Sequence, residues 1–188
     1  MEHTTRKTFI FIGEEMIIMN KFEKISKQRY FIDTEKRFEP NCWADEVHAT
    51  EEYENIKLPQ RTTTGSAGYD FYAPYDITIL PRQSAKVPTG IRAILDEDKF
   101  LAIYPRSGLG FKYKMQLFNS VGIVDSDYSQ SDNEGHIWVK FYNDSPDGKT
   151  ITIRQGEAMC QGIIQQFFKT VDDETDGVRN GGFGSTTK

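Results

Sequence analysis

Hydrophobic and polar positions alternate in short runs from Leu58 onward, and glycine or proline separates the runs. In residues 137–142, Ile, Val and Phe fall on one side of an extended chain, while Trp, Lys and Tyr fall on the other. This two-residue period predicts a strand with one buried face. Further strands are expected at residues 77–79, 87–95, 100–104, 151–153 and 163–168. Because no ten-residue window after Leu58 shows a clear helical period, the pattern indicates an all-β sandwich, barrel or jelly roll.

The two ends of the chain differ from this pattern. Residues 1–55 are rich in charge and poor in glycine, and the acidic stretch from Glu46 to Glu54 predicts a solvated linker. A first strand is expected at residues 29–32 (RYFI). Residues 172–188 hold few apolar side chains and several glycines, which predicts a flexible arm. The expected organisation is an N-terminal extension and linker (1–55), a β core (56–171) and a C-terminal arm (172–188).

The first residues raise a separate question about the start of translation. Codons for Gly13-Glu14-Glu15 can spell a purine-rich ribosome-binding sequence, and Met16 and Met19 follow closely. We hypothesise that translation naturally begins at one of these methionines, so that the first 15–18 residues are not native. The apolar run at residues 9–12 is too short for a signal peptide and is followed by two acidic residues.

Charge and composition exclude several classes of partner. The net charge of -5 argues against a sequence-independent DNA-binding protein, although local arginines still allow an anionic small substrate. Cys42 and Cys160 form no CxxC pair, which favours a reducing, cytoplasmic setting. His3, His48 and His136 lack zinc-ligand spacing and are expected at the surface. No apolar run is long enough to cross a membrane, so neither nucleic acid nor membrane is an expected partner.

The segment from Gly122 to Tyr128 (GIVDSDY) carries the most informative chemistry. Gly122 lets the backbone of an apolar strand approach a ligand closely, Asp125 supplies a carboxylate, and Tyr128 supplies a ring. This combination suits a flat ligand held by backbone hydrogen bonds, with a base that activates water. The alternative from these residues alone is an apolar strand that ends in an Asp-Ser-Asp turn.

Four further segments carry chemistry that is weaker when each is taken alone. In PRSGLG (105–110), Arg106, Ser107 and Gly108 can bind phosphate, or the segment is an ordinary turn. Asp70 lies where a strand is expected to begin, and its alternative is a capped turn. Gln161 can orient a phosphate or a water, or is simply solvated. The GGFGS segment (181–185) suits a flap that closes a ring over a ligand, or a disordered tail.

The order and spacing of these segments carry a resemblance. SAGYDFYAP, PRSGLG, NSVGIVDSDY, GEAMCQGII and RNGGFGST together resemble the five ordered motifs of the trimeric dUTP pyrophosphatases (dUTPases), over about residues 56–187. The resemblance implies a distorted jelly-roll β-barrel, a homotrimer with a flexible C-terminal flap, and hydrolysis of dUTP to dUMP and pyrophosphate. It also implies Mg²⁺ held mainly through the substrate phosphates, with no direct protein ligand. Such an activity keeps uracil out of DNA and supplies dUMP for thymidylate synthesis.

The same resemblance assigns roles to individual residues. Asp125 matches the carboxylate that activates the water attacking the α-phosphorus, and Tyr128 matches the ring that packs on deoxyribose. The residues implied to read uracil are Asn119, Gly122, Ile123 and Val124. Those implied to bind the triphosphate are Arg106, Ser107, Gly108 and Gln161, with Asp70 in support. Those implied to form the flap are Arg179, Phe183, Gly184 and Ser185, with Phe183 over uracil and Arg179 and Ser185 at the terminal phosphates.

The chain departs from the dUTPase pattern at three places. Residues Ser129–Gly135 form a longer polar connection after Tyr128, expected to be a surface hairpin rather than a new binding element. The flap spacing between Arg179 and Gly182 is one residue short, and Thr187 stands at a usual glycine position. Two other functions remain open: a dCTP deaminase-like enzyme, and a nucleotide-responsive regulatory protein with its own protein partner.

Overall fold

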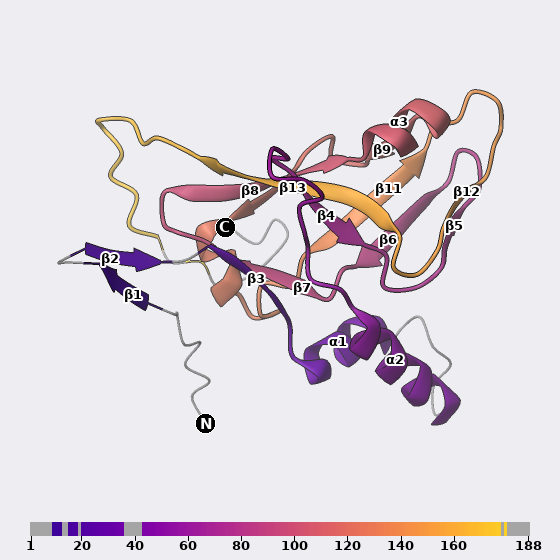
Figure 1. Ribbon diagram of the computed structural model, residues 1–188, viewed down its shortest axis with the longest axis horizontal. Coiled ribbons are helices and arrows are strands. Elements are labelled where there is room, and N and C mark those ends of the chain that lie inside the picture. Colours follow the sequence, from indigo (N-terminus) through magenta and orange to yellow (C-terminus); the bar gives the residue numbers. More distant parts are fainter. Residues whose placement is uncertain (1–8, 13–14, 19, 36–42, 178, 180–188) are drawn as a thin grey trace.

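The computed structural model describes residues 9–12, 15–18, 20–35, 43–177 and 179, with side chains described at 20–35, 47–177 and 179 (Figure 1). The strands are β1 Phe9–Ile12, β2 Glu15–Ile18, β3 Lys21–Lys24, β4 Tyr69–Tyr72, β5 Ile77–Ile79, β6 Ser84–Pro88, β7 Ile91–Ile94, β8 Lys99–Pro105, β9 Met115–Leu117, β10 Gly122–Asp125, β11 Trp138–Asn143, β12 Ile151–Ile153 and β13 Ala158–Gln166. The helices are α1 Lys27–Thr34, α2 Trp43–Asn55, α3 Ser107–Tyr113 and the 3-10 helix η2 Ser126–Gln130.

The body of the molecule consists of antiparallel sheets around one core. A four-stranded sheet has the order β10-β8-β13-β4, a three-stranded sheet has the order β6-β11-β9, and β12-β5 and β3-β7 form pairs. Buried side chains of both larger sheets, among them Leu101 of β8 and Phe141 of β11, belong to one apolar cluster. In β11, Val139 and Phe141 are buried and Lys140 is exposed, as the alternation predicts. The all-β prediction is confirmed for the core.

The strand expected at residues 87–95 is interrupted, so this prediction is wrong in detail. β6 ends at Pro88 and β7 begins at Ile91, and Gly90 between them has a φ of +70°. A side chain at Gly90 would collide with Ile56, and this left-handed conformation favours glycine. The break turns the chain, so that β6 pairs with β11 while β7 pairs with β3.

The N-terminal region is helical where a strand and a linker were expected. Residues 29–32 belong to α1, because the Ser26 side chain accepts from the Arg29 N–H and caps the helix. Tyr30 and Thr34, four residues apart on one face, are fully buried. The acidic stretch expected as a linker forms α2, whose Tyr53 ring lies 5.8 Å from the Tyr30 ring. A helix can expose its acidic face and bury the opposite one, so charge alone did not exclude it.

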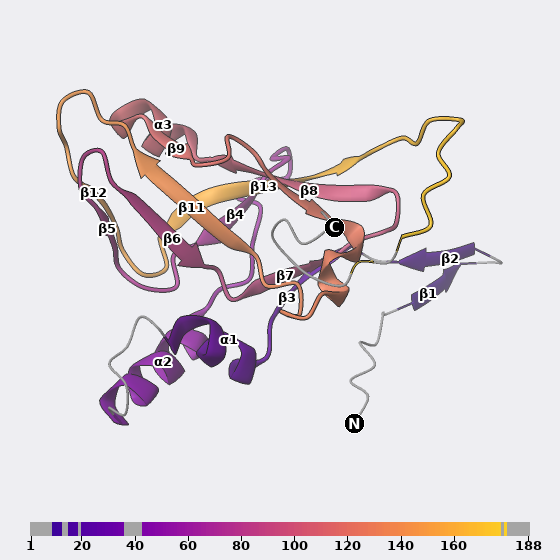
Figure 2. The same cartoon turned by 180° about the vertical axis from the view of Figure 1, so that it is seen from behind.

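Both helices lie side by side at one end of the body, whereas β1 and β2 form a separate hairpin (Figures 1 and 2). The extension joins the body through β3, which pairs with β7 over Lys21–Lys24. The described residues from 167 to 177, after β13, are exposed. Within the described residues, no helix is long and apolar enough to cross a membrane.

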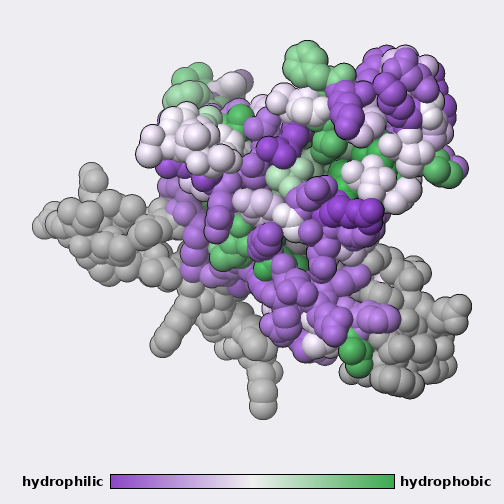
Figure 3. Space-filling model, turned by 45° about the vertical axis from the view of Figure 1, so that its right-hand side comes forward, coloured by the Kyte–Doolittle hydropathy of each residue, from purple (hydrophilic) through white to green (hydrophobic). Residues whose placement is uncertain are grey.

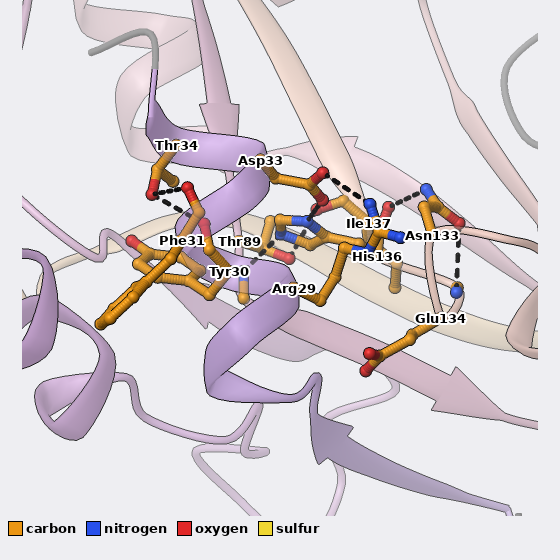
Figure 4. A network of polar contacts seen from close by, with 12 residues as sticks. Arg29, Tyr30, Phe31, Asp33, Thr34, Thr89, Asn133, Glu134, His136 and Ile137 are labelled. Carbon is orange, nitrogen blue, oxygen red and sulfur yellow. Dashed lines mark hydrogen bonds and ion pairs between the residues drawn. The ribbon is translucent and has the colours of Figure 1, made fainter. Parts of the chain in front are cut away.

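His136 lies in the interior, so its expected surface position is wrong. Its ring is fully buried, and Nδ1 lies 2.5 Å from Oδ2 of Asp33 in α1 (Figure 4). Its Nε2 accepts from the Gly90 N–H at 2.9 Å. Burial lowers the pKa of His136, and the ring is neutral with its proton on Nδ1. His48 is exposed as expected, and His3 lies outside the described residues.

Candidate functional site

A pocket of about 350 Å³ opens where β4, β13 and the start of α3 meet. The structure brings four of the predicted triphosphate-side residues into it. Its lining consists of Thr62, Ser66, Ala67, Gly68, Asp70, Arg106, Ser107, Gln161 and Ile163. A guanidinium, hydroxyls and an amide converge here, and these groups are suited to bind the oxygens of a phosphate.

The strand register explains this convergence. Gln161 of β13 pairs with both Asp70 of β4 and Tyr104 of β8, so the three residues lie at one level of the sheet. Arg106 follows β8 directly and begins α3 as its N-cap residue. Its Nε lies 3.2 Å from Oδ1 of Asp70, and Oδ2 accepts from the Thr62 hydroxyl at 3.3 Å. Asp70 therefore orients Arg106, whose guanidinium has further N–H groups to donate.

Gly68 lines the pocket but was not among the site residues predicted from the sequence. A Cβ atom at this position would lie 2.7 Å from Oε1 of Gln161, so a side chain there would displace the amide. The glycine in SAGYD was the available signal, since isolated glycines often mark a close approach. Gly108 does not line the pocket. It lies in the first turn of α3, where helical N–H groups lack intrahelical acceptors.

The predicted base lies at a different part of the sheet. Asp125 ends the edge strand β10, opposite Phe100 of β8, and its side chain is 51% exposed. Gln161 pairs with Tyr104, four residues further along β8 and two strands across from β10. At about 3.3 Å per residue and about 4.8 Å per strand, Asp125 and Gln161 are separated by roughly 16 Å. The predicted site residues therefore form two separate groups on one chain.

Tyr128 lies in η2, close to Asp125, and is buried. Its hydroxyl donates to the His136 carbonyl at 3.0 Å and accepts from Nδ2 of Asn133 at 2.9 Å. Burial raises the pKa of the Tyr128 phenol, so the hydroxyl stays neutral. One ring face has the Arg179 guanidinium above it, 5.8 Å from the ring centre.

Arg179 contacts carboxylates and not the phosphate-side pocket. Its Nη2 donates to Asp125, and its Nε donates to Asp127 at 2.7 Å. The structure thus places it with the predicted base, some distance from Arg106. The other flap residues, Phe183, Gly184 and Ser185, lie outside the described residues, so their roles stay predictions.

The residues predicted to read uracil lie in the turn between β9 and β10 and in β10 itself. Asn119 is exposed, and its carbonyl accepts from the Val121 N–H at 2.7 Å. Gly122, Ile123 and Val124 run along the edge of the sheet, and Ile123 is 57% exposed. Because β10 is an edge strand, its outer backbone groups can pair with a ligand.

Within the part of the chain that the structure describes, no group of three or more His, Cys, Asp or Glu side chains could hold a metal ion. The donors around the 350 Å³ pocket are mainly a guanidinium, hydroxyls and an amide, which suit phosphate oxygens better than a cation.

The structure is an all-β barrel that carries a pocket suited to phosphate and, apart from the pocket, a carboxylate on an edge strand. Residues 54–187 match the family model described as dUTPase. The chain belongs to the dUTPase family, and the jelly-roll prediction is confirmed with it.

Two relatives from bacteria show the extent of the similarity. A deoxyuridine 5'-triphosphate nucleotidohydrolase of Lactococcus lactis is 37% identical over 134 residues, which is 70% of this chain and 88% of the relative. One from Finegoldia magna is 40% identical over 141 residues, 70% of this chain and 92% of the relative.

A solved structure agrees with these matches. The dUTPase of Streptococcus mutans has a TM-score of 0.56 and 34% identity, and the match covers 62% of this chain and 90% of that one. The dUTPase of phage phi11 of Staphylococcus aureus, at 18% identity and a TM-score of 0.54 over 66% of this chain and 92% of that one, shares the fold.

Proposed function

We propose that this chain hydrolyses dUTP to dUMP and pyrophosphate, with Asp125 activating the water that attacks the α-phosphorus. The observation that carries the proposal is the Arg106 pocket within a dUTPase-family barrel. Phosphoryl substitution depends mainly on neutralising charge and orienting the nucleophile, and the two groups of site residues supply these two functions.

The triphosphate binds in the pocket of Arg106, Ser107 and Gln161. The ion pair with Asp70 holds the Arg106 guanidinium in place, at 3.2 Å from Nε to Oδ1. Nη1 also donates to the Ala158 carbonyl at 3.4 Å, and the other N–H groups of the guanidinium bind phosphate oxygens in pairs. Gly108 adds a backbone N–H from the first turn of α3. Arg179 and Ser185 join from the C-terminal arm at the terminal phosphates, where Arg179 exchanges its contacts with Asp125 and Asp127 for phosphate oxygens.

The nucleoside binds along the outer edge of β10. Asn119 and the backbone of Gly122–Val124 read the uracil edge, with Phe183 of the arm over the base. Tyr128 packs on the deoxyribose, where an added 2′-hydroxyl collides with the ring. Asp125, at the end of the same strand, takes a proton from the water as general base.

The site is completed between copies of the chain, which we propose form a homotrimer. Asp125 and Gln161 of one chain are roughly 16 Å apart by strand geometry. The α- and γ-phosphorus atoms of dUTP are separated only by the β-phosphorus and two bridging oxygens, a much shorter span. A second copy therefore brings its pocket to the Asp125 of the first.

Exposed apolar groups support this assembly. Figure 3 shows a largely hydrophilic surface in which apolar residues are exposed at separate places. Among them, Ile123 of β10 and Phe118 before it are 57% and 60% exposed, next to the uncovered edge of the sheet. An exposed edge strand with apolar side chains is a natural surface for a partner copy.

We propose that Mg²⁺ binds together with the substrate. The pocket offers donors to phosphate oxygens and no set of metal ligands among the described residues, which fits a cation carried by the triphosphate. When bound, it neutralises phosphate charge. The phage phi11 dUTPase structure concerns the coordination of a structural Mg(II) ion.

We also place the enzyme in the cytoplasm, because Cys160 is an unpaired buried thiol.

A nucleotide panel tests the function. Pyrophosphate release is measured from dUTP, UTP, dTTP and dCTP with Mg²⁺, together with ammonia release from dCTP. We expect turnover of dUTP alone. Ammonia release from dCTP would replace the proposal with a deaminase, and equal use of UTP would remove the role given to Tyr128.

A further inference from the structure

The loop of residues 129–136 holds Tyr128 from two directions. Beyond Tyr128 the chain makes a tight turn, and the Ser131 N–H donates to the Tyr128 carbonyl at 3.1 Å. The Tyr128 hydroxyl, at the other end of the side chain, meets the His136 carbonyl at 3.0 Å and Nδ2 of Asn133 at 2.9 Å. The backbone and the ring tip of Tyr128 are therefore both attached to this loop.

Helix α1 holds the same loop at three points. Glu134 accepts from the Ser26 backbone N–H at 2.7 Å and from its hydroxyl at 2.6 Å. Arg29 donates to the Asp132 carbonyl at 2.8 Å. Asp33 lies 2.5 Å from Nδ1 of His136, toward which its side chain points (Figure 4). The polar connection expected as a surface hairpin is thus the docking site of α1.

The loop also has a compact backbone conformation. Glu134 and Gly135 have φ values of +59° and +74°, in the left-handed region. A Cβ atom at Gly135 would lie 2.6 Å from the Ser129 Cα. Asn133 closes the turn, because its Oδ1 accepts from the Ser131 hydroxyl at 3.0 Å and from the Gly135 N–H at 3.2 Å. Close packing of this kind transmits a displacement at α1 to the residues that hold Tyr128.

We propose that Asn133 and His136 are positioning residues for Tyr128, clamped by α1, and that they set the preference for deoxyribose over ribose. This inference rests on the proposed contact between Tyr128 and the sugar. The Tyr128 ring excludes a 2′-hydroxyl only if the ring cannot move away from the added oxygen. The two hydrogen bonds of the Tyr128 hydroxyl hold the ring in place. The N-terminal extension thereby contributes to substrate selection without touching the substrate.

The first experiment is a double-mutant cycle on the full chain. The readout is the ratio of kcat/KM for dUTP to kcat/KM for UTP, which a general loss of stability does not change. Tyr128→Phe keeps the ring and removes the hydroxyl, and we expect it to lower the ratio about fivefold, the value of one net hydrogen bond. Asn133→Ala is expected to lower the ratio similarly, and the double variant to lower it no further.

The second experiment tests the contribution of α1. Asp33→Ala removes the acceptor for the His136 ring and is expected to lower the ratio. Asp33→Asn keeps an acceptor oxygen and is expected to leave the ratio close to that of the unchanged chain. Glu23→Ala is the matched control. It removes the acceptor of a different link of the extension to the body, the ion pair with Arg92 at 2.7 Å. We expect Glu23→Ala to leave the ratio unchanged.

Different outcomes overturn the sugar contact of Tyr128 and the positioning role of Asn133 and His136. If Tyr128→Ala leaves the ratio unchanged, the proposed sugar contact is wrong and the positioning role is lost with it. If Tyr128→Ala lowers the ratio but Tyr128→Phe does not, or if Asn133→Ala and Tyr128→Phe add, only the positioning role is wrong. Where UTP turnover is too slow to measure, the ratio of Kd values for dUDP and UDP replaces it.

Discussion

Two variants of this chain with reduced activity are expected to restore each other's activity when they share an oligomer. The first, Asp125→Asn, removes the base at the edge of β10. The second, Arg106→Ala, removes the guanidinium of the pocket. Because the two groups of site residues lie roughly 16 Å apart on one chain by strand geometry, a working site takes one from each of two copies.

The size of the recovery follows from this geometry. Asp125→Asn alone is expected to lower kcat at least ~10²-fold, as for the loss of a general base. Arg106→Ala alone is expected to cost roughly 10- to 100-fold in kcat/KM, the value of a hydrogen bond from a charged group. In a random equal mixture, half of the Asp125 groups and half of the pockets are intact. About a quarter of the sites then combine both intact parts, provided that the oligomer is a closed ring of equivalent interfaces.

The assay is pyrophosphate release after the two variants are unfolded together in urea and refolded as a mixture. The matched control combines Asp125→Asn with Tyr128→Ala, two changes in the same half of the site, for which no recovery is expected. As a second control, the two variants are refolded separately and then mixed. This sample gives the activity when no chains are exchanged between oligomers. Recovery in the control pair, or none in the Asp125→Asn and Arg106→Ala mixture when mixed oligomers have formed, would refute a site shared between copies.

Three further predictions concern packing, pH and the C-terminal arm. Gly162→Ala places a Cβ 2.8 Å from side-chain atoms of Leu101 and Phe71, so the unfolding free energy in urea should fall by about 1–3 kcal/mol, whereas Gly65→Ala, with open space around it, should change little. The lowered pKa of His136 means that, below about pH 6.5, the unfolded state takes up a proton that the folded state does not. The unfolding free energy should therefore fall from pH 7.5 to 5.5, less steeply in His136→Gln, and equal slopes would exclude His136 as the cause. Deleting residues 179–188 should lower kcat at least ~10-fold without changing the oligomer in sedimentation, and normal turnover would remove the arm from the site.

The interaction between the N-terminal extension and the loop shows where sequence reasoning stopped. Charge predicted a linker at Glu46–Glu54, because acidic stretches are most often solvated. The lack of zinc-ligand spacing predicted a surface position for His136. The burial of His136 depends on α1, whose Asp33 contacts its ring from 103 residues earlier in the chain. Tyr30 of α1 packs against the same ring, with 6.3 Å between the ring centres. No local pattern in the sequence indicates a contact between two segments so far apart in the chain.

The sequence by itself determined the β core and the chemistry available to the site. Alternation is local, so the strands at 77–79 and 151–153 appear with the bounds expected from it. The order of the motifs also identified the dUTPase family and the residues in question. Only the tertiary structure decided how those residues group, since strand register sets Asp70 beside Gln161 and places Asp125 at the far edge. Register arises from pairing between strands distant in the chain, and that pairing divides the site into two halves.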